Sequence, residues 1–442
     1  PWQTYEYLTR CSQIPAGERL RSDSSSMPNN LWGFPSYAVQ EAWEEKSLAP
    51  LWNVLSEPII CDYWTPRAGM VFRGMQKEAD RIGYWPTVQR GQVRMVRRRQ
   101  QGGYFTILTP PAGATATRRL AYRSRIVHVA VGYPGLKFLP DLQAYREKHK
   151  DHEHVVNAYE PHEHVYSELN RRSCVVVVRG GGIVASRVLQ RLIDDRDQQG
   201  AQTTIIHLFR TFISGSHGPN LFNRRRGADG WAYQGFNYPK SVWGGELWAR
   251  FRKLEGDDRL KLYKTIGGTN TPHRKNWIAM QDRGRREGWY RTLTGEVLEV
   301  MPGEDGKVVT AIRLSSQHAE AASLQIAADF IIDCTGLEAE IEEHRVLADL
   351  LEHSGAGRNV LGRLDVERTF EVRGTRSGDG RMYASGAATL GGYFPGVDTF
   401  LGLQLAAREI TDDIAALGMV PRLGSLRSIR EWWRCVHGTP PA

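Results

Sequence analysis

The chain of 442 residues is 41% hydrophobic and 24% charged, which is ordinary for a globular protein, and no apolar run reaches the roughly 18 residues of a membrane-spanning helix. Its length favours two to three domains. The formal net charge of +9 would suit a nucleic acid or an anionic surface, but the arginines are spread along the chain, so we expect neither a nucleic-acid nor a membrane partner. The five cysteines form no CxxC pair, which excludes a redox dithiol and favours reduced thiols in the cytoplasm.

The first 140 residues predict a few separate elements. After an irregular start, the segment 65–83 predicts a helix, because proline suits its first turn and glycine its C-terminal end. A β-hairpin is expected over 88–108, with solvated arginines. A buried strand is expected at 126–131, ending at Gly132.

The segment 141–170 is polar and holds five of the thirteen histidines. Two His-Glu-His triplets, at 152–154 and 162–164, resemble metal ligands. Zinc ligands have to converge from fixed spacings, however, and this segment has the composition of a charged loop. We therefore expect a solvated connector, or one histidine that contacts a cofactor, and no metal site.

The segment 173–210 has the pattern of a βαβ unit. An apolar strand at 174–178 is followed by three glycines, a helix that ends at Gly200 and a second strand at 203–209. This order is typical of a nucleotide-binding domain.

The glycine turn of this unit predicts a dinucleotide site. Gly180, Gly182 and Ala185 fit the pattern G-x-G-x-x-G/A, in which glycines permit the tight turn and the approach of a pyrophosphate, and the small third residue lets the helix pack closely. The helix N-terminus then offers N–H groups and a positive dipole to the phosphates. The expected binding residues are Gly180, Gly181, Gly182, Ala185, Ser186 and Arg187. The alternative is a glycine-rich connection without a ligand.

The end of the second strand indicates which dinucleotide is bound. An NAD site has Asp or Glu there to bind the ribose, whereas this chain has His207 and then Arg210. An arginine can pair with a 2′-phosphate, so Arg210 favours NADPH.

Residues 211–290 are basic, aromatic and rich in glycine, and predict an insertion or lid. The aromatic side chains of this insertion either line a substrate pocket or pack against one another within the insertion. They are Trp231, Tyr233, Phe236, Tyr238, Trp243 and Trp248.

The last third of the chain alternates between strands and helices. Strands are expected over 291–335, a helix over 338–353 and a strand near 381–386. A final helix is expected with Asp398 as its N-cap and Gly418 as its C-terminal stop.

Three motifs then resemble those of a known family. "VHVAVGYPGLKFLP" is similar to the strand that ends in ATGxP in flavoproteins with two dinucleotide sites, and "ADFIIDCTGLEAEI" to the second such strand, with Thr335 and Gly336 as its TG. "GVDTFLGLQLAAREI" resembles the FAD-side C-terminal motif of flavin-dependent N-hydroxylating monooxygenases, the ornithine/lysine hydroxylase group.

The resemblance implies an α/β fold of two Rossmann-like, three-layer nucleotide-binding domains, with the NADP domain inserted in the FAD domain. It implies a first FAD segment at 1–165, an NAD(P) domain at 166–325 and a second FAD segment at 326–442. Its cofactors are FAD and NADPH, and NADPH reduces FAD for the O2-dependent oxygenation of a small-molecule nucleophile. The final helix is expected to direct its N-terminus at the flavin. The FAD-side residues are Thr335, Gly336, Gly386, Asp398, Thr399, Phe400 and Leu401.

The sequence departs from this family in two places. No glycine fingerprint precedes the one at Gly180, so the first βαβ unit of the FAD domain is expected to be absent from this chain. Three alternatives would explain this absence: a second polypeptide supplies the unit, the unit was removed, or it never existed. The motif "YASGA" lacks the aspartate of disulfide reductases, which disfavours an enzyme of that class.

Two alternatives to an oxygenase remain. One is an NAD(P)H–flavin dehydrogenase without oxygenation, and the other is a non-catalytic nucleotide-binding subunit. Because the cofactors carry the difficult chemistry, no catalytic side chain is predicted. The substrate and a homo-oligomeric state are left open.

Overall fold

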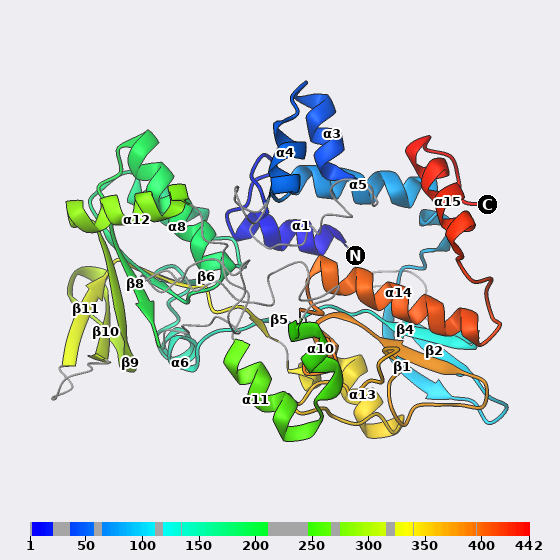
Figure 1. Ribbon diagram of the computed structural model, residues 1–442. Helices are drawn as coiled ribbons and strands as arrows, with labels where there is room; N and C mark the ends of the chain where they lie inside the picture. The colour runs from blue at the N-terminus through cyan, green and yellow to red at the C-terminus, as the bar shows by residue number, and fades with distance from the viewer. Residues whose placement is uncertain are drawn as a thin grey trace.

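The computed structural model describes residues 2–20, 36–56, 64–110, 118–133, 135–210, 246–266, 275–314, 323–338, 340–394 and 396–442. These residues form two lobes side by side, with a group of N-terminal helices along one side of both (Figure 1). The mixed α/β architecture agrees with the expected fold class. The aromatic residues expected to wall a pocket, 231–248, lie outside the described side chains.

The first lobe is built on a seven-stranded sheet in the order β11-β10-β9-β8-β7-β12-β6. The five strands from β9 to β6 are parallel, and β10 and β11 continue the sheet in antiparallel fashion. The strands are β6 (Val155–Asn157), β7 (Val175–Arg179), β8 (Thr204–Phe209), β9 (Tyr290–Pro302), β10 (Val308–Leu314), β11 (Ser323–Ala328) and β12 (Phe330–Asp333).

Helices cover both faces of the parallel strands. Side chains of α7 and α8 pack with one face of β7 in one apolar cluster, while Leu142 and Tyr145 of α6 pack with Val177 on the other face. Because β7 is buried on both faces, its sequence is a continuous run of valines rather than an alternating pattern. The helices of this lobe are α6 (Pro140–His149), α7 (Glu163–Leu169), α8 (Ile183–Gln199) and α12 (Lys275–Glu287).

The segment 141–170 is not the connector that its polar composition predicts. It forms α6, β6 and α7, because most of its apolar side chains, among them Leu142, Val155 and Leu169, are buried. The sheet also takes a strand from each side of the expected NAD(P) domain, since β6 precedes residue 166 and β12 follows residue 325. The domain bounds themselves stay a prediction.

The second lobe contains a smaller parallel pair, β4 and β14, beside an antiparallel sheet of β1, β2 and β3. The predicted hairpin is confirmed by the pairing of β1 with β2. A large apolar cluster joins β4 and β14 to α13 and α14. The elements are β1 (Gln92–Arg98), β2 (Tyr104–Thr109), β3 (Leu120–Ser124), β4 (Ile126–Val129), β14 (Arg381–Ala384), η5 (Gly386–Thr389), α13 (Arg345–His353) and α14 (Phe400–Ala416).

A short ribbon links the two lobes. Strand β5 (Gly135–Leu136), which follows β4, pairs antiparallel with β13 (Leu337–Glu338), which follows β12. Figure 1 shows this ribbon between the lobes. It brings the chain after Gly132 next to the chain after Gly336, the glycines of the two TG-like motifs.

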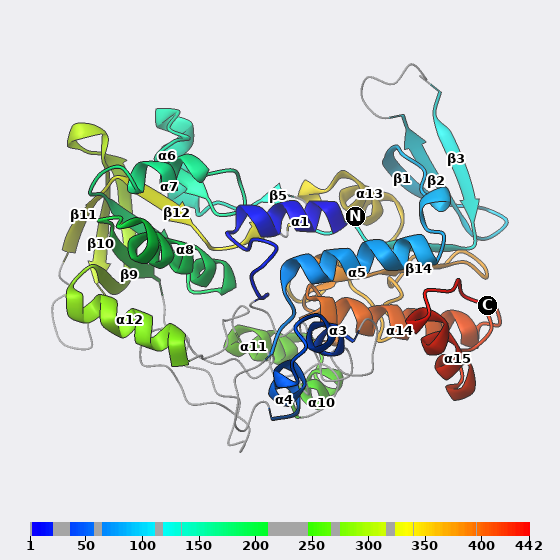
Figure 2. The ribbon, with the colours of Figure 1, turned by 90° about the horizontal axis from the view of Figure 1, so that it is seen from above.

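The remaining helices lie at the ends of the chain and beside the second lobe (Figure 2). The predicted helix at 65–83 is confirmed as α5 (Ala68–Arg81). The others are α1 (Trp2–Cys11), α3 (Tyr37–Glu44), α4 (Ala49–Ser56), α10 (Glu246–Lys253), α11 (Gly256–Ile266) and α15 (Ser425–Val436), with single 3-10 turns η1 (Trp85–Thr87), η3 (Glu304–Gly306) and η4 (Ile341–Glu343). Among the described residues, none of the helices combines the length and the apolar character needed to cross a bilayer.

Candidate functional site

The turn between β7 and α8 has the geometry that the glycine pattern predicts. Gly180 has a φ of 118°, a conformation that favours glycine. A Cβ atom at Gly180 would lie 2.8 Å from the carbonyl oxygen of Cys334, and one at Gly181 would lie 3.0 Å from the ring of Phe209. The turn is therefore packed between the carboxyl ends of β12 and β8, and it tolerates no larger residue at Gly180 without a shift of the backbone.

A buried histidine holds the glycine turn through a hydrogen bond to its backbone. His207 of β8 is fully buried, and its Nε2 lies 2.6 Å from the carbonyl oxygen of Gly180. Because a carbonyl only accepts, Nε2–H is the donor, and Nδ1 accepts from the hydroxyl of Tyr290 at 3.0 Å. Burial lowers the pKa of His207 to about 4. The histidine is thus neutral near pH 7, and sequence reasoning noted it without recognising this role.

The N-terminus of α8 carries no side-chain cap. Gly182 is the N-cap, and no side chain among the described residues accepts a hydrogen bond from the first turn. Ala185 and Ser186 are fully buried, and the Ser186 hydroxyl donates to the carbonyl of Ile183 at 2.6 Å. The N–H groups at the start of this helix of 17 residues therefore face the glycine turn without a partner from a side chain, as an anion site requires.

The two expected arginines lie in different surroundings. Arg187 is 2% exposed, and its Nε and Nη2 donate to the carbonyl of Gln13 at 3.1 and 2.8 Å, while Nη1 lies 3.3 Å from Glu18. It anchors the segment after α1 to α8, so a role in phosphate binding would require these contacts to break. Arg210 directly follows β8 and is exposed.

The second TG-like motif lies beside the glycine turn. Thr335 follows β12, where its N–H and its hydroxyl both donate to Asp333 Oδ1, at 2.9 and 2.6 Å. Gly336 has a φ of 123°, and no atom lies within 4 Å of the position that a Cβ would take. Since the carbonyl of Cys334 touches Gly180, the ends of β7 and β12 form one surface at the carboxyl edge of the sheet.

Of the expected FAD-side residues, Asp398, Thr399, Phe400 and Leu401 lie at the start of α14, whereas Thr335 and Gly336 lie beside the glycine turn of the first lobe. The predicted N-cap is wrong: α14 begins at Phe400, and its cap is Thr399, whose Oγ1 accepts from the N–H of Gly402 at 3.1 Å and donates to the carbonyl of Gly396 at 2.7 Å. Leu401 lies in the first turn. Gly386, with a φ of 77°, begins the turn η5 that follows β14.

Asp398 is not a cap because it binds a tyrosine. The hydroxyl of Tyr133 donates to Asp398 Oδ2 at 2.6 Å, and burial together with this carboxylate raises the pKa of Tyr133 well above its usual value. The ring of Phe400 meets that of Tyr5 from α1 edge to face, with centroids 4.8 Å apart. The start of α14 is thus in contact with both the β4–β5 link and the N-terminal helix, an arrangement that the sequence did not indicate.

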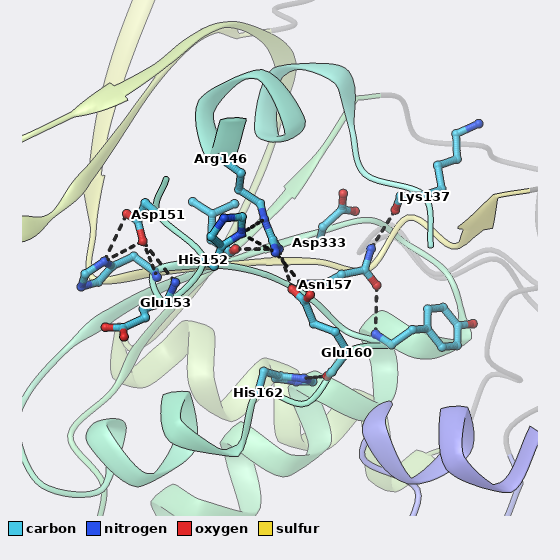
Figure 3. A network of polar contacts seen from close by, with 12 residues as sticks. Lys137, Arg146, Asp151, His152, Glu153, Asn157, Glu160, His162 and Asp333 are labelled. Atoms are coloured by element: carbon cyan, nitrogen blue, oxygen red, sulfur yellow. Dashed lines mark hydrogen bonds and ion pairs between the residues drawn. The ribbon is translucent and has the colours of Figure 1, made fainter. Parts of the chain in front are cut away.

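The histidines of 141–170 take part in an ordinary polar network (Figure 3). Arg146 donates to His152 and binds Glu160, His154 contacts Asp151, and Nδ1 of His162 donates to the carbonyl of Glu160 at 2.7 Å. At the edge of the sheet, the Asn157 amide donates to the carbonyl of Lys137, and burial raises the pKa of Asp333. Within the described residues, no group of three or more metal-ligating side chains converges.

Sequence comparison does not place this chain: neither models of protein families nor curated proteins match it significantly. Solved structures, in contrast, match this chain over most of its length. An L-lysine 6-monooxygenase from Pseudomonas syringae is 12% identical to this chain, with a TM-score of 0.62. The match covers 94% of this chain and 90% of the lysine monooxygenase. The FAD-bound cadaverine monooxygenase DfoA of Erwinia amylovora is 13% identical with a TM-score of 0.60, covering 91% and 85%.

A third similar structure is an ornithine N-hydroxylase from Kutzneria, with reduced FAD, NADP+ and L-ornithine. It is 13% identical with a TM-score of 0.58 and covers 92% of this chain and 89% of its own. The structural neighbours are thus the N-hydroxylating monooxygenases that the motifs resemble. At this level of identity, the likeness establishes that the chain has their fold.

Proposed function

We propose that this chain is a flavin-dependent oxidoreductase that takes hydride from NADPH for the oxygenation of a small nucleophilic molecule by O2. The observation that carries the proposal is the uncapped glycine turn at the start of α8, in a chain with the fold of the amino-acid and diamine monooxygenases. An NADPH–flavin dehydrogenase remains the second candidate.

The residues of the first lobe fit NADPH. The backbone of Gly180, Gly181 and Gly182 would approach the pyrophosphate, and the buried Ala185 leaves α8 close to β7. Arg210 supplies a cation at the end of β8, where an acid would be needed for NAD. His207 holds the turn through the Gly180 carbonyl, so the N–H groups of α8 are oriented before the dinucleotide binds.

The residues of the second lobe fit part of an FAD site. The turn after Gly386 and the start of α14 would hold the flavin end, and FAD, when bound, supplies the transfer of electrons to O2. Thr399 fixes the first turn of α14, and Tyr133 holds Asp398 beside it. The 442 residues contain one glycine fingerprint, which is taken by NADPH in this proposal, so a second polypeptide that supplies the other stays a prediction.

The first substrates to test are aliphatic amines, because the similar structures are named for lysine, cadaverine and ornithine. We would incubate the purified chain with FAD, NADPH and each amine, and measure NADPH oxidation together with O2 consumption. Matched consumption and a hydroxylamine product support the oxygenase. NADPH oxidation with another acceptor and no O2 uptake supports the dehydrogenase. A chain that binds neither NADP+ nor FAD contradicts both.

A further inference from the structure

The C-terminal helix α15 presents an apolar face to solvent. Leu426, Ile429, Trp433 and Val436 are 85%, 64%, 59% and 55% exposed. Their spacing of three or four residues places them along one side of the helix. Single exposed apolar residues are common, but a continuous stripe with a tryptophan indicates an interaction surface.

Arginines flank this stripe on the same helix. Arg427, Arg430 and Arg434 repeat at helical spacing directly beside the apolar side chains, and Glu431 is the only acidic residue of α15. Arg427 and Arg430 are exposed, and in the part of the chain that the structure describes, no carboxylate lies within ion-pair distance of either. The helix is therefore basic and amphipathic, with its cations at the border of the apolar face.

The opposite side of α15 is fixed to α5. Arg81 donates from Nη1 to the carbonyl of Thr439 at 2.8 Å, and Cys435 Sγ lies 3.9 Å from Glu78 Oε2. A groove between the two helices is lined by Glu78, Arg81 and Trp432, and Ile429 of the stripe also lines it. These contacts hold the helix at the periphery of the molecule (Figure 2).

A second exposed apolar surface, on α3 and α4, has a different balance of charges. Trp43 is 86% exposed, and Glu44, Glu45 and Lys46 follow it directly, with Glu45 paired to Arg67, so this surface lacks the excess of cations that borders α15. The two surfaces thus share exposed tryptophans and differ in the balance of the adjacent charges. This difference makes Trp43 a matched control for Trp433.

In contrast to the expectation from the overall distribution of arginines, we propose that α15 docks on an anionic lipid bilayer, with its apolar stripe in the interfacial layer and its arginines on the headgroup phosphates. Helices of this composition lie in the plane of a membrane surface, where each cation adds attraction to anionic lipids. A second copy of the chain fits less well, since a two-fold contact through the stripe would bring like-charged arginines together.

The test is co-sedimentation of the full chain with vesicles. We expect binding to vesicles that contain phosphatidylglycerol, weaker binding at high salt, and little binding to vesicles of phosphatidylcholine alone. Equal binding to both kinds of vesicle, or to neither, overturns the proposal.

Two variants locate the contact. Arg427→Gln with Arg430→Gln should weaken binding about 25-fold, at about 5-fold for each arginine. Trp433→Ser should weaken it at least about 10-fold, whereas Trp43→Ser should leave it unchanged. Equal effects of the two tryptophan variants, or a dimer in size-exclusion chromatography that Trp433→Ser abolishes, would overturn it. Circular dichroism should show that both tryptophan variants are folded, because Trp433 and Trp43 are exposed.

Discussion

The two lobes differ in how the helix that follows a parallel strand begins, directly after β7 in the first lobe and after the turn η5 in the second. In the first lobe, α8 starts at Gly182 with no side-chain cap from the described residues and with its N–H groups toward a half-buried turn. In the second lobe, Thr399 caps α14, and Gly402 presses its first turn onto the backbone of Gly396. We expect the first helix start to accept an anion, whereas the second holds its own backbone in one place.

The largest effect is expected where the backbone contact is closest. In Gly402→Ala, the new Cβ would lie 2.1 Å from the carbonyl oxygen of Gly396, so the start of α14 has to shift. We expect a loss of about 4 kcal/mol or more in the free energy of unfolding, measured by chemical denaturation. Gly418→Ala, at the other end of α14, meets no atom within 4 Å and should cost only about 1 kcal/mol, the cost of its positive φ. Equal losses in the two variants would contradict the role of Gly402.

The next effect concerns the histidine under the first turn. The folded pKa of His207 is about 4 and lies below the usual value of about 6.5, so the unfolded state binds the proton more readily. Its contribution is complete above pH 6.5 and is lost as the pH falls toward 4, by up to about 3 kcal/mol. The loss of stability between pH 7 and pH 4 should be smaller in His207→Gln than in the wild type, since the other buried histidines are common to both. Parallel pH profiles would show that His207 does not carry this dependence.

A smaller effect is expected at the end of β8. If Arg210 binds the 2′-phosphate, Arg210→Gln removes a charge-assisted hydrogen bond worth about 1.5–3 kcal/mol. NADP+ should then bind about 10- to 100-fold more weakly, and NAD+ should bind as before, both measured by calorimetry. A variant that loses affinity for both dinucleotides alike would place Arg210 elsewhere in the site.

Neighbouring residues in the sequence predicted the start of α8 correctly, but they did not identify the N-cap of α14. The β7–α8 turn depends on neighbouring residues, so strand, glycines and helix were all predictable from the sequence. Thr399 and Asp398 are both good N-caps; the choice between them depends on Tyr133, which is 265 residues away and takes the carboxylate of Asp398.

Long-range contacts also explain the other differences. Arg187 stands in the first turn of α8, where a phosphate role is reasonable, but Gln13 and Glu18 reach it from the N-terminal segment. The segment 141–170 is polar in composition, and only the burial of a few apolar side chains shows that it contributes two helices and the edge strand β6.

The central claim, that the start of α8 binds the phosphates of NADPH, is tested most directly by one pair of variants. Gly182→Asp and Gly182→Asn replace the N-cap by residues of equal size and similar capping strength, so both should unfold at similar temperatures. In a calorimetric titration with NADPH, either side chain narrows the approach of the pyrophosphate, so the Asn variant is the reference for the Asp variant. The Asp variant should bind at least about 30-fold more weakly, because its carboxylate repels the phosphates. Equal affinities of the two variants would contradict the account.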